Sequence, residues 1–93
     1  MTVLATFTKQ PADRLDYDFD YTRFLAATDA IESAVFTVEP SGLVIDATIT
    51  EPTFTKVWLA GGTTGTTYKV TCTVTTDHGR IKQDELKVRV REY

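Results

Sequence analysis

The feature that most constrains the fold is a pair of alternating segments joined by a short turn near the end of the sequence. In 68–74 every second residue is apolar, and the residues between them are lysine and threonine. The alternation resumes in 86–90, where lysine and arginine separate the apolar positions. A period of two residues is typical of a β-strand with one buried face. The segment 59–90 is therefore predicted to form one long β-hairpin, closed by a turn over 76–80.

Five further segments are rich in β-branched and aromatic residues, and turn residues such as Pro40, Gly42 and Gly61 separate them: 3–8, 14–21, 30–39, 43–49 and 54–60. Short strands at this spacing predict an all-β protein. We expect an immunoglobulin-like β-sandwich of about seven antiparallel strands, with a small unclosed barrel as the alternative. A chain of 93 residues is predicted to form a single domain, 1–93.

Several segments carry finer expectations. Ile31 is out of phase with the apolar residues that follow it, which predicts a β-bulge near Glu32 or Ser33. Ile81 and Leu86 are likewise out of phase, which predicts a second bulge within 83–85. The segment 22–29 fits either a single helical turn or a loop that crosses between the sheets. The alternation of 43–49 predicts four inward side chains: Leu43, Ile45, Ala47 and Ile49.

Composition argues against several classes of protein. The formal net charge is −3, whereas nucleic-acid binding depends on clustered lysine and arginine, so no nucleic-acid partner is expected. The sequence shows no signal peptide, membrane span or lipidation motif, which predicts a protein made and kept in a cytoplasm, without a membrane partner. The single cysteine, Cys72, cannot form an intrachain disulfide and is predicted to be a buried, unreactive thiol.

No motif predicts catalysis or a cofactor. Asp16, Asp18 and Asp20 could bind calcium weakly, but a calcium loop also needs glycine and glutamate at set positions, so a solvated acidic strand face is the better interpretation. The glycines of 61–65 precede a strand and lack the lysine of a phosphate-binding loop. His78 is alone and is predicted to be exposed. We therefore expect a non-enzymatic protein with no catalytic, cofactor-binding or metal-binding residues.

The order of several short motifs resembles that of small tailed-phage and prophage proteins known as phage fibre-tail adaptors. The matching stretches lie between Lys9 and Glu92: Lys9-Gln10-Pro11, Leu15-Asp16-Tyr17-Asp18, Thr28-Asp29-Ala30-Ile31, Leu59-Ala60-Gly61-Gly62-Thr63-Thr64-Gly65 with Tyr68, Thr75-Thr76-Asp77-His78-Gly79-Arg80 and Val88-Arg89-Val90-Arg91-Glu92. The specificity of the resemblance lies in their order and spacing.

This resemblance implies a structural protein of the virion, made in the host bacterial cytoplasm, that joins a receptor-binding fibre to the tail tube or baseplate. Its expected partners are phage tail and fibre proteins, and a ring of identical subunits in the virion is compatible with that role. No catalytic residues come with the family. The alternative is a small carbohydrate-binding or surface-adhesion module, since the ring of Trp58 and the tyrosines could stack on sugars.

Five residues are candidate partner contacts: Trp58, Thr71, Thr73, Thr75 and Tyr93. The three threonines form a β-branched, uncharged strand face, which is either a docking surface or a solvated face that uses threonine for its strand propensity. Trp58 falls among the polar positions of its strand. Either a loop covers its ring or the ring contacts a partner, because tryptophan is enriched at binding hot spots.

Overall fold

The computed structural model describes residues 2–92, and the side chains of residues 5–92. The described residues form strands without any helix, so none of their segments is a helix long and apolar enough to span a membrane. The strands are β1 (Thr2–Lys9), β2 (Leu15–Asp20), β3 (Ile31–Glu39), β4 (Leu43–Thr50), β5 (Phe54–Gly61), β6 (Thr67–Thr76) and β7 (Ile81–Val90). The all-β prediction is confirmed, and the segment 22–29 is a loop with turns that crosses between the sheets.

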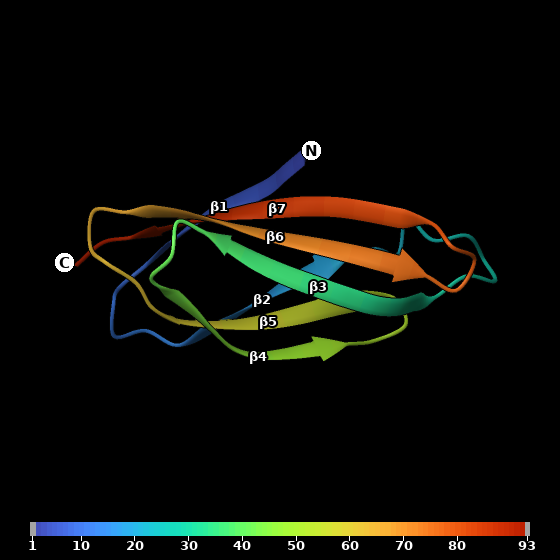
Figure 1. The fold of residues 1–93 in the computed structure, drawn as a ribbon, viewed down its shortest axis with the longest axis horizontal. Coiled ribbons are helices and arrows are strands. Elements are labelled where there is room, and N and C mark those ends of the chain that lie inside the picture. The colour runs from blue at the N-terminus through green and yellow to red at the C-terminus, as the bar shows by residue number, and fades with distance from the viewer. Residues whose placement is uncertain (1, 93) are drawn as a thin grey trace.

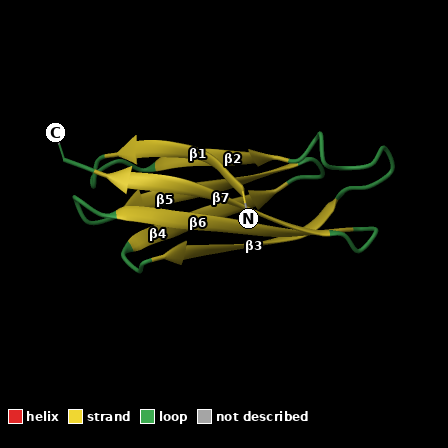
Figure 2. Cartoon of the chain, turned by 90° about the horizontal axis from the view of Figure 1, so that it is seen from above, coloured by secondary structure: helices red, strands yellow, loops and turns green. Residues whose placement is uncertain are grey.

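The strands form two layers (Figure 1). One is a four-stranded sheet in the order β1-β7-β6-β3, and the other is a three-stranded sheet in the order β2-β5-β4. The strands follow the long axis of a body that measures 45 × 22 × 19 Å, and the loops gather at its two ends (Figure 2). The orders β7-β6-β3 and β2-β5-β4 are compatible with the two sheets of an immunoglobulin-like sandwich.

The prediction that all strands are antiparallel is wrong at one place. β1 pairs with β7 in the parallel direction, while the other neighbouring strands pair antiparallel. A parallel pair needs a long crossover connection rather than a tight turn. Here the chain passes through both sheets between β1 and β7, so the first and last strands can lie side by side in the same direction.

The interior is built from the inward positions of both sheets. The predicted alternation of β6 is confirmed, because Tyr68, Val70, Cys72 and Val74 are all buried. β5 and β7 contribute Val57, Leu59, Leu86, Val88 and Val90, and β2 contributes Tyr17, Phe19 and Tyr21. Phe24 and Leu25 from the 22–29 loop pack against this cluster. The side chains of the two sheets thus meet in one apolar core.

Two bulge predictions meet different outcomes. The pairing of β3 with β6 shifts register between Ile31 and Ser33, as predicted. β7 instead pairs with β6 in unbroken register, so the predicted bulge within 83–85 is wrong. Without it, Ile81 stays on the outer face with 70% of its surface exposed, and Asp84 turns inward with 2% exposed. The Lys82 Nζ lies 3.3 Å from the Asp84 carboxylate, which partly compensates that buried charge.

A bulge that the sequence did not predict lies in β4. The pairing of β4 with β5 shifts between Ile45 and Ala47, which leaves Asp46 as the extra residue. An extra residue shifts the two-residue alternation by one position, so each later residue of the strand points to the opposite face of the sheet. Ala47 lies opposite the outward-facing Trp58, so the predicted inward orientation of Ala47 and Ile49 is wrong. Both side chains are exposed on the outer face of the three-stranded sheet.

Polar contacts close one end of the sandwich. The Tyr68 hydroxyl accepts a hydrogen bond from the Thr63 backbone N–H at 2.9 Å. The buried Lys9 ammonium donates to the backbone carbonyls of Gln10 at 2.8 Å and Gly61 at 2.5 Å, which ties the end of β1 to the end of β5. Burial lowers the pKa of Lys9 below its usual value. A single lysine therefore connects the two sheets where the strands end.

Replacing Leu59 by alanine is expected to destabilise the fold by about 2–5 kcal/mol, because it leaves a cavity in a fully buried site. Ile81→Ala is the control, since the same kind of truncation at an exposed position leaves no cavity. Urea unfolding of both variants measures the difference. Equal losses of stability would contradict the assignment of the two positions to the inside and the outside.

Candidate docking surfaces

The three threonines of β6 lie on the outer face of the four-stranded sheet. Thr71 is buried between its cross-strand neighbours Thr37 and Glu85, while Thr73 and Thr75 are half-buried. The Thr73 hydroxyl accepts a hydrogen bond from the Gln83 side-chain amide at 3.1 Å. The Gln83 side chain therefore fixes the Thr73 hydroxyl, and the row presents methyl groups and hydroxyls rather than long flexible chains.

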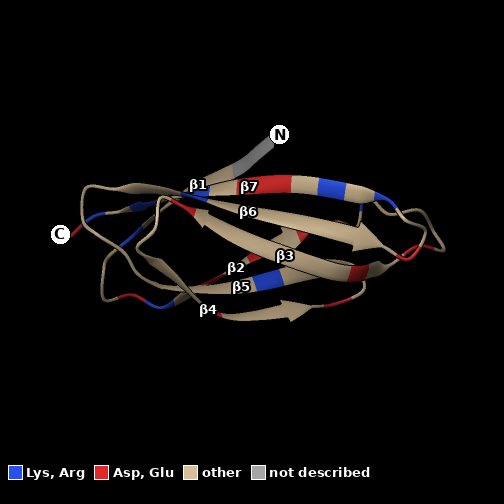
Figure 3. Cartoon of the chain, viewed as in Figure 1, with Lys and Arg blue, Asp and Glu red and all other residues tan. Residues whose placement is uncertain are grey.

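The strand register extends this row sideways into a wider surface. Thr75 lies between Ser33 and Ile81, and Thr73 lies between Val35 and Gln83. We call these two cross-strand rows the uncharged face: Ser33, Val35, Thr73, Thr75, Ile81 and Gln83. Val35 is 62% exposed and Ile81 70%, the two highest values among the large hydrophobic side chains of residues 5–92. The middle of β3 and β6 is free of charge (Figure 3).

Charged residues border the uncharged face on one side. Two rows further along, Lys69 lies between Glu39 and Lys87. The Lys69 Nζ is 3.5 Å from the Glu39 carboxylate and 3.9 Å from that of Glu85. An apolar and hydroxylated area beside a mixed-charge border resembles the centre and rim of a protein interface.

Trp58 is half-buried on the outer face of the three-stranded sheet. The Arg14 guanidinium lies 4.4 Å from the centroid of its ring, and Arg14 also forms an ion pair with Asp46 of the β4 bulge. A side chain from the β1–β2 loop thus covers part of the ring, as one of the two sequence interpretations supposed. In the strand register Trp58 lies between Asp16 of β2 and Ala47 of β4.

The acidic residues of β2 face outward beside Trp58. The Lys56 Nζ lies 2.7 Å from the Asp16 carboxylate and 3.1 Å from that of Asp18. The hydrogen bond from Lys56 lowers the pKa of Asp16, and the same carboxylates raise the pKa of Lys56. An ammonium group therefore already lies against two of the three carboxylates considered for calcium. Within residues 2–92 no three His, Cys, Asp or Glu side chains are grouped to hold a metal ion.

A shallow hollow of about 270 Å³ lies beside these carboxylates and is lined by Asp18, Asp20, Thr22, Thr53 and Phe54. Asp20 accepts hydrogen bonds from the Thr22 hydroxyl at 2.6 Å and the Thr22 backbone N–H at 2.9 Å, and these bonds lower its pKa. Its carboxylate is thus occupied in shaping the turn. Cys72 lies elsewhere, buried in the core as predicted, and burial raises the pKa of its thiol.

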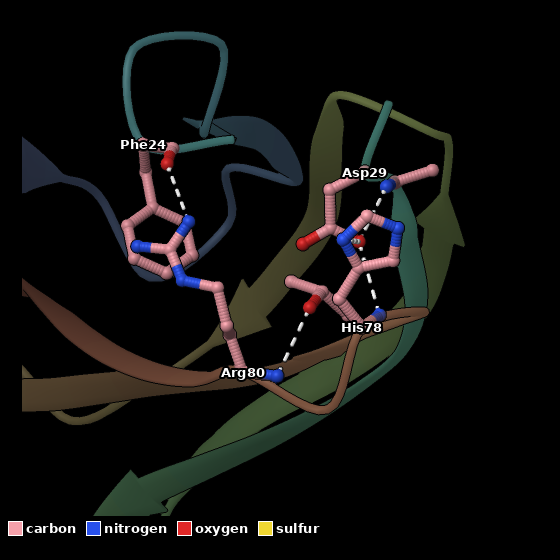
Figure 4. A network of polar contacts seen from close by, with 6 residues as sticks. Phe24, Asp29, His78 and Arg80 are labelled. Atoms are coloured by element: carbon pink, nitrogen blue, oxygen red, sulfur yellow. Dashed lines mark hydrogen bonds and ion pairs between the residues drawn. The ribbon is translucent and has the colours of Figure 1, made fainter. Parts of the chain in front are cut away.

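A polar network fixes the opposite end of the sandwich, where the 21–30 loop meets the β6–β7 turn (Figure 4). Asp29 accepts hydrogen bonds from the backbone N–H groups of Ala30 at 2.9 Å and His78 at 3.1 Å. Arg80 donates to the Phe24 carbonyl at 3.0 Å, and its guanidinium lies over the Phe24 ring at 3.9 Å. The His78 side chain is exposed, as predicted.

The structure brings together only some of the predicted contact residues. Thr71, Thr73 and Thr75 share one sheet face, whereas Trp58 lies on the other sheet, and Tyr93 lies outside the described residues. Sequence reasoning missed Val35 and Ile81 as surface residues. For Val35 the only indication of an outward side chain was its position between the inward residues of β3. For Ile81 the predicted β7 bulge hid the corresponding indication.

A comparison with protein families shows a match over most of the chain. Residues 9–89 match a family model described as Podophage GP4 fiber-tail adaptor protein gp77. No curated protein matches the sequence. The matched range begins at the buried Lys9, the last residue of β1, and ends within β7, so it includes β2 to β6 and nearly all of β7.

We expect Asp29→Asn to destabilise the fold most at neutral pH. Burial alone would raise the pKa of Asp29, but hydrogen bonds from Thr76, His78 and Ala30 and the charge of His78 bring it below its usual value. A lowered carboxyl pKa stabilises the fold above the unfolded pKa of about 3.9, and this contribution is lost as the pH falls through the folded pKa.

Unfolding by urea across a pH series measures this effect. Asp77→Asn is the control, because it removes an exposed carboxylate from the same turn. The stability difference between the wild-type protein and Asp29→Asn should shrink toward about pH 2. If the stability difference near pH 2 equals that at neutral pH, the charge of Asp29 does not contribute to the stability of the fold.

Proposed function

The chain belongs to the podophage fiber-tail adaptor family that its residues 9–89 match, and on this premise we propose that it is a structural protein of the virion that joins a tail fibre to the tail or baseplate. It acts as one immunoglobulin-like module, 1–93, made in the host cytoplasm and incorporated into the particle. The role is mechanical and needs no cofactor, catalysis, nucleic acid or membrane.

The observation that carries this proposal is the uncharged face of the four-stranded sheet. It presents Val35 and Ile81, which among the side chains of residues 5–92 are the two most exposed large hydrophobic ones, on a paired and therefore rigid backbone. Val35 and Ile81 lie on either side of the β6 threonines, and burying their apolar surface against a partner is favourable. Thr73 and Thr75 add hydroxyls that can bond to the same partner.

The remaining candidate contacts are secondary parts of the proposal. Trp58 and Tyr93 could extend the contact to other partners, and a ring of identical subunits would place several copies around the tail. The sugar-binding alternative has less support, since stacking on a sugar needs a bare ring and the Arg14 guanidinium lies over that of Trp58.

Co-expression with the fibre and tail proteins encoded beside this chain tests the adaptor role. We expect a stable complex with at least one of them in size-exclusion chromatography. Val35→Glu should weaken that complex about tenfold or more, because it places an unpaired charge in the contact. Ala12→Glu, a matched charge on an exposed loop at one end of the sandwich, should not.

Two results would count against the proposal. A wild-type chain that forms no complex with any of these proteins would remove the adaptor role itself. A complex that is equally stable with Val35→Glu and with Ala12→Glu would leave the adaptor role in place but would move the contact away from the uncharged face.

A further inference from the structure

The sandwich has four edge strands, and three of them carry features that discourage pairing with another strand. β2 has aspartate at every second position. β3 has Glu32 in a bulge at one end and Glu39 followed by Pro40 at the other. β1 ends in the inward-pointing, buried Lys9 and is followed by Pro11. Charge, bulges and proline at an edge are the usual means by which a sheet avoids adding a strand.

The fourth edge, β4, has a bulge at Asp46 and is followed by Glu51 and Pro52, but the four residues between them carry neither charge, bulge nor proline. Its residues 47–50 read Ala-Thr-Ile-Thr, and all four side chains are exposed. The only charged residue of β4 is Asp46, which lies in the bulge and is paired with Arg14. Figure 1 shows β4 at the border of the molecule, with β5 on one side and no strand on the other. A short, uncharged, β-branched edge is suited to accept another strand.

The alternation of backbone hydrogen bonds shows which groups this edge offers. The Glu51 N–H donates to the Phe54 carbonyl at 2.9 Å, so these two residues form a hydrogen-bonded pair. In an antiparallel ladder such pairs alternate with non-bonded ones. Ile49 and Ala47 therefore bond to β5, and the N–H and C=O groups of Thr48 and Thr50 point away from it, toward the free edge.

The side chains beside this edge form an apolar strip. Val44 is 52% exposed and Ile49 41%, and together with Ala47 they lie on the outer face next to β5. The strip continues onto Trp58, which is paired with Ala47. A strand added at β4 would therefore gain side-chain contacts on the outer face as well as backbone hydrogen bonds.

The charge of the three-stranded sheet indicates what kind of strand would fit. Its strands β2, β4 and β5 contain four aspartates and one lysine, and Arg14 lies against Asp46 on the same face, so the formal charge is −2, while the strands of the other sheet contain five basic and four acidic residues. Pairing β4 with β4 of a second copy would join two acidic sheets. A strand that carries lysine or arginine would instead be attracted.

We propose that the β4 edge binds an extended, lysine- or arginine-bearing segment of a partner protein, which adds to the three-stranded sheet as a fourth strand beside Thr48 and Thr50. The inference rests on the proposed function, in that it supplies a second contact of the same adaptor. Backbone hydrogen bonds at the edge give the binding, and the Val44, Ala47 and Ile49 strip favours apolar or β-branched residues at alternate positions.

A synthetic peptide that alternates threonine and valine with lysine tests the site directly. In the free protein the Thr48 and Thr50 amides should exchange rapidly with solvent, and those of Ala47 and Ile49, bonded to β5, should exchange slowly. The peptide should slow exchange at Thr48 and Thr50 severalfold. Saturating peptide that protects neither amide would overturn the proposal, and this measurement needs no variant to fold.

Two substitutions at one position separate the backbone from the side chain. Thr48→Pro removes the outward N–H without removing a bond to β5, so it should weaken peptide binding about tenfold. Thr48→Val keeps the N–H and should bind like the wild-type protein. A matched peptide with glutamate in place of lysine should also bind about tenfold more weakly. Equal binding of the two peptides, or of Thr48→Pro and Thr48→Val, would contradict the proposal.

Light scattering and co-expression distinguish the remaining outcomes. A dimer of the chain alone that Thr48→Pro abolishes would identify the occupant as a second copy and overturn the partner strand. The complex with tail proteins can also be compared for the two variants. If it is as stable with Thr48→Pro as with Thr48→Val, the edge site is wrong, while the adaptor role stands. Absence of any complex with the wild-type chain would remove the adaptor role.

Discussion

The structure depends on the burial of alternate side chains from two sheets against one another. β6 lies between β7 and β3, and its inward residues Val70, Cys72 and Val74 are wholly buried in one core with the β5 residues Val57 and Leu59. Each such aliphatic side chain contributes about 1.5–3 kcal/mol when it leaves water. Because a strand that buries one face must present the other, this same alternation determines which residues are left to meet a partner.

A single extra residue in a strand changes which of its side chains face the core and which face outward. The bulge at Asp46 reverses the parity of β4, so Ala47 and Ile49 leave the interior and join Trp58 on the outer face. The unbroken register of β7 has the opposite consequence, since it keeps Ile81 outside and brings Asp84 into the core. Both docking surfaces proposed for this chain thus follow from the presence or absence of one extra residue in a strand.

The two proposed surfaces differ in the kind of partner that they fit. The uncharged face around Val35 and Ile81 is rigid and apolar, which suits a folded partner. The β4 edge offers backbone groups beside an acidic sheet, which suits an extended basic segment. They lie on different sheets, so both could be occupied at once. Arg14 and Lys56 meanwhile neutralise part of the acidic face through ion pairs with Asp46, Asp16 and Asp18.

The sequence by itself determined the all-β class, the strand positions and the buried face of β6, because a period of two residues is a local property that each strand carries alone. It also placed the bulge in β3, where Ile31 is visibly out of phase. Only the tertiary structure decided the bulge at Asp46, the burial of Lys9 and Asp84, and the parallel pairing of β1 with β7. These features depend on which residue of a distant strand lies opposite, and cross-strand register arises only when the sheets assemble.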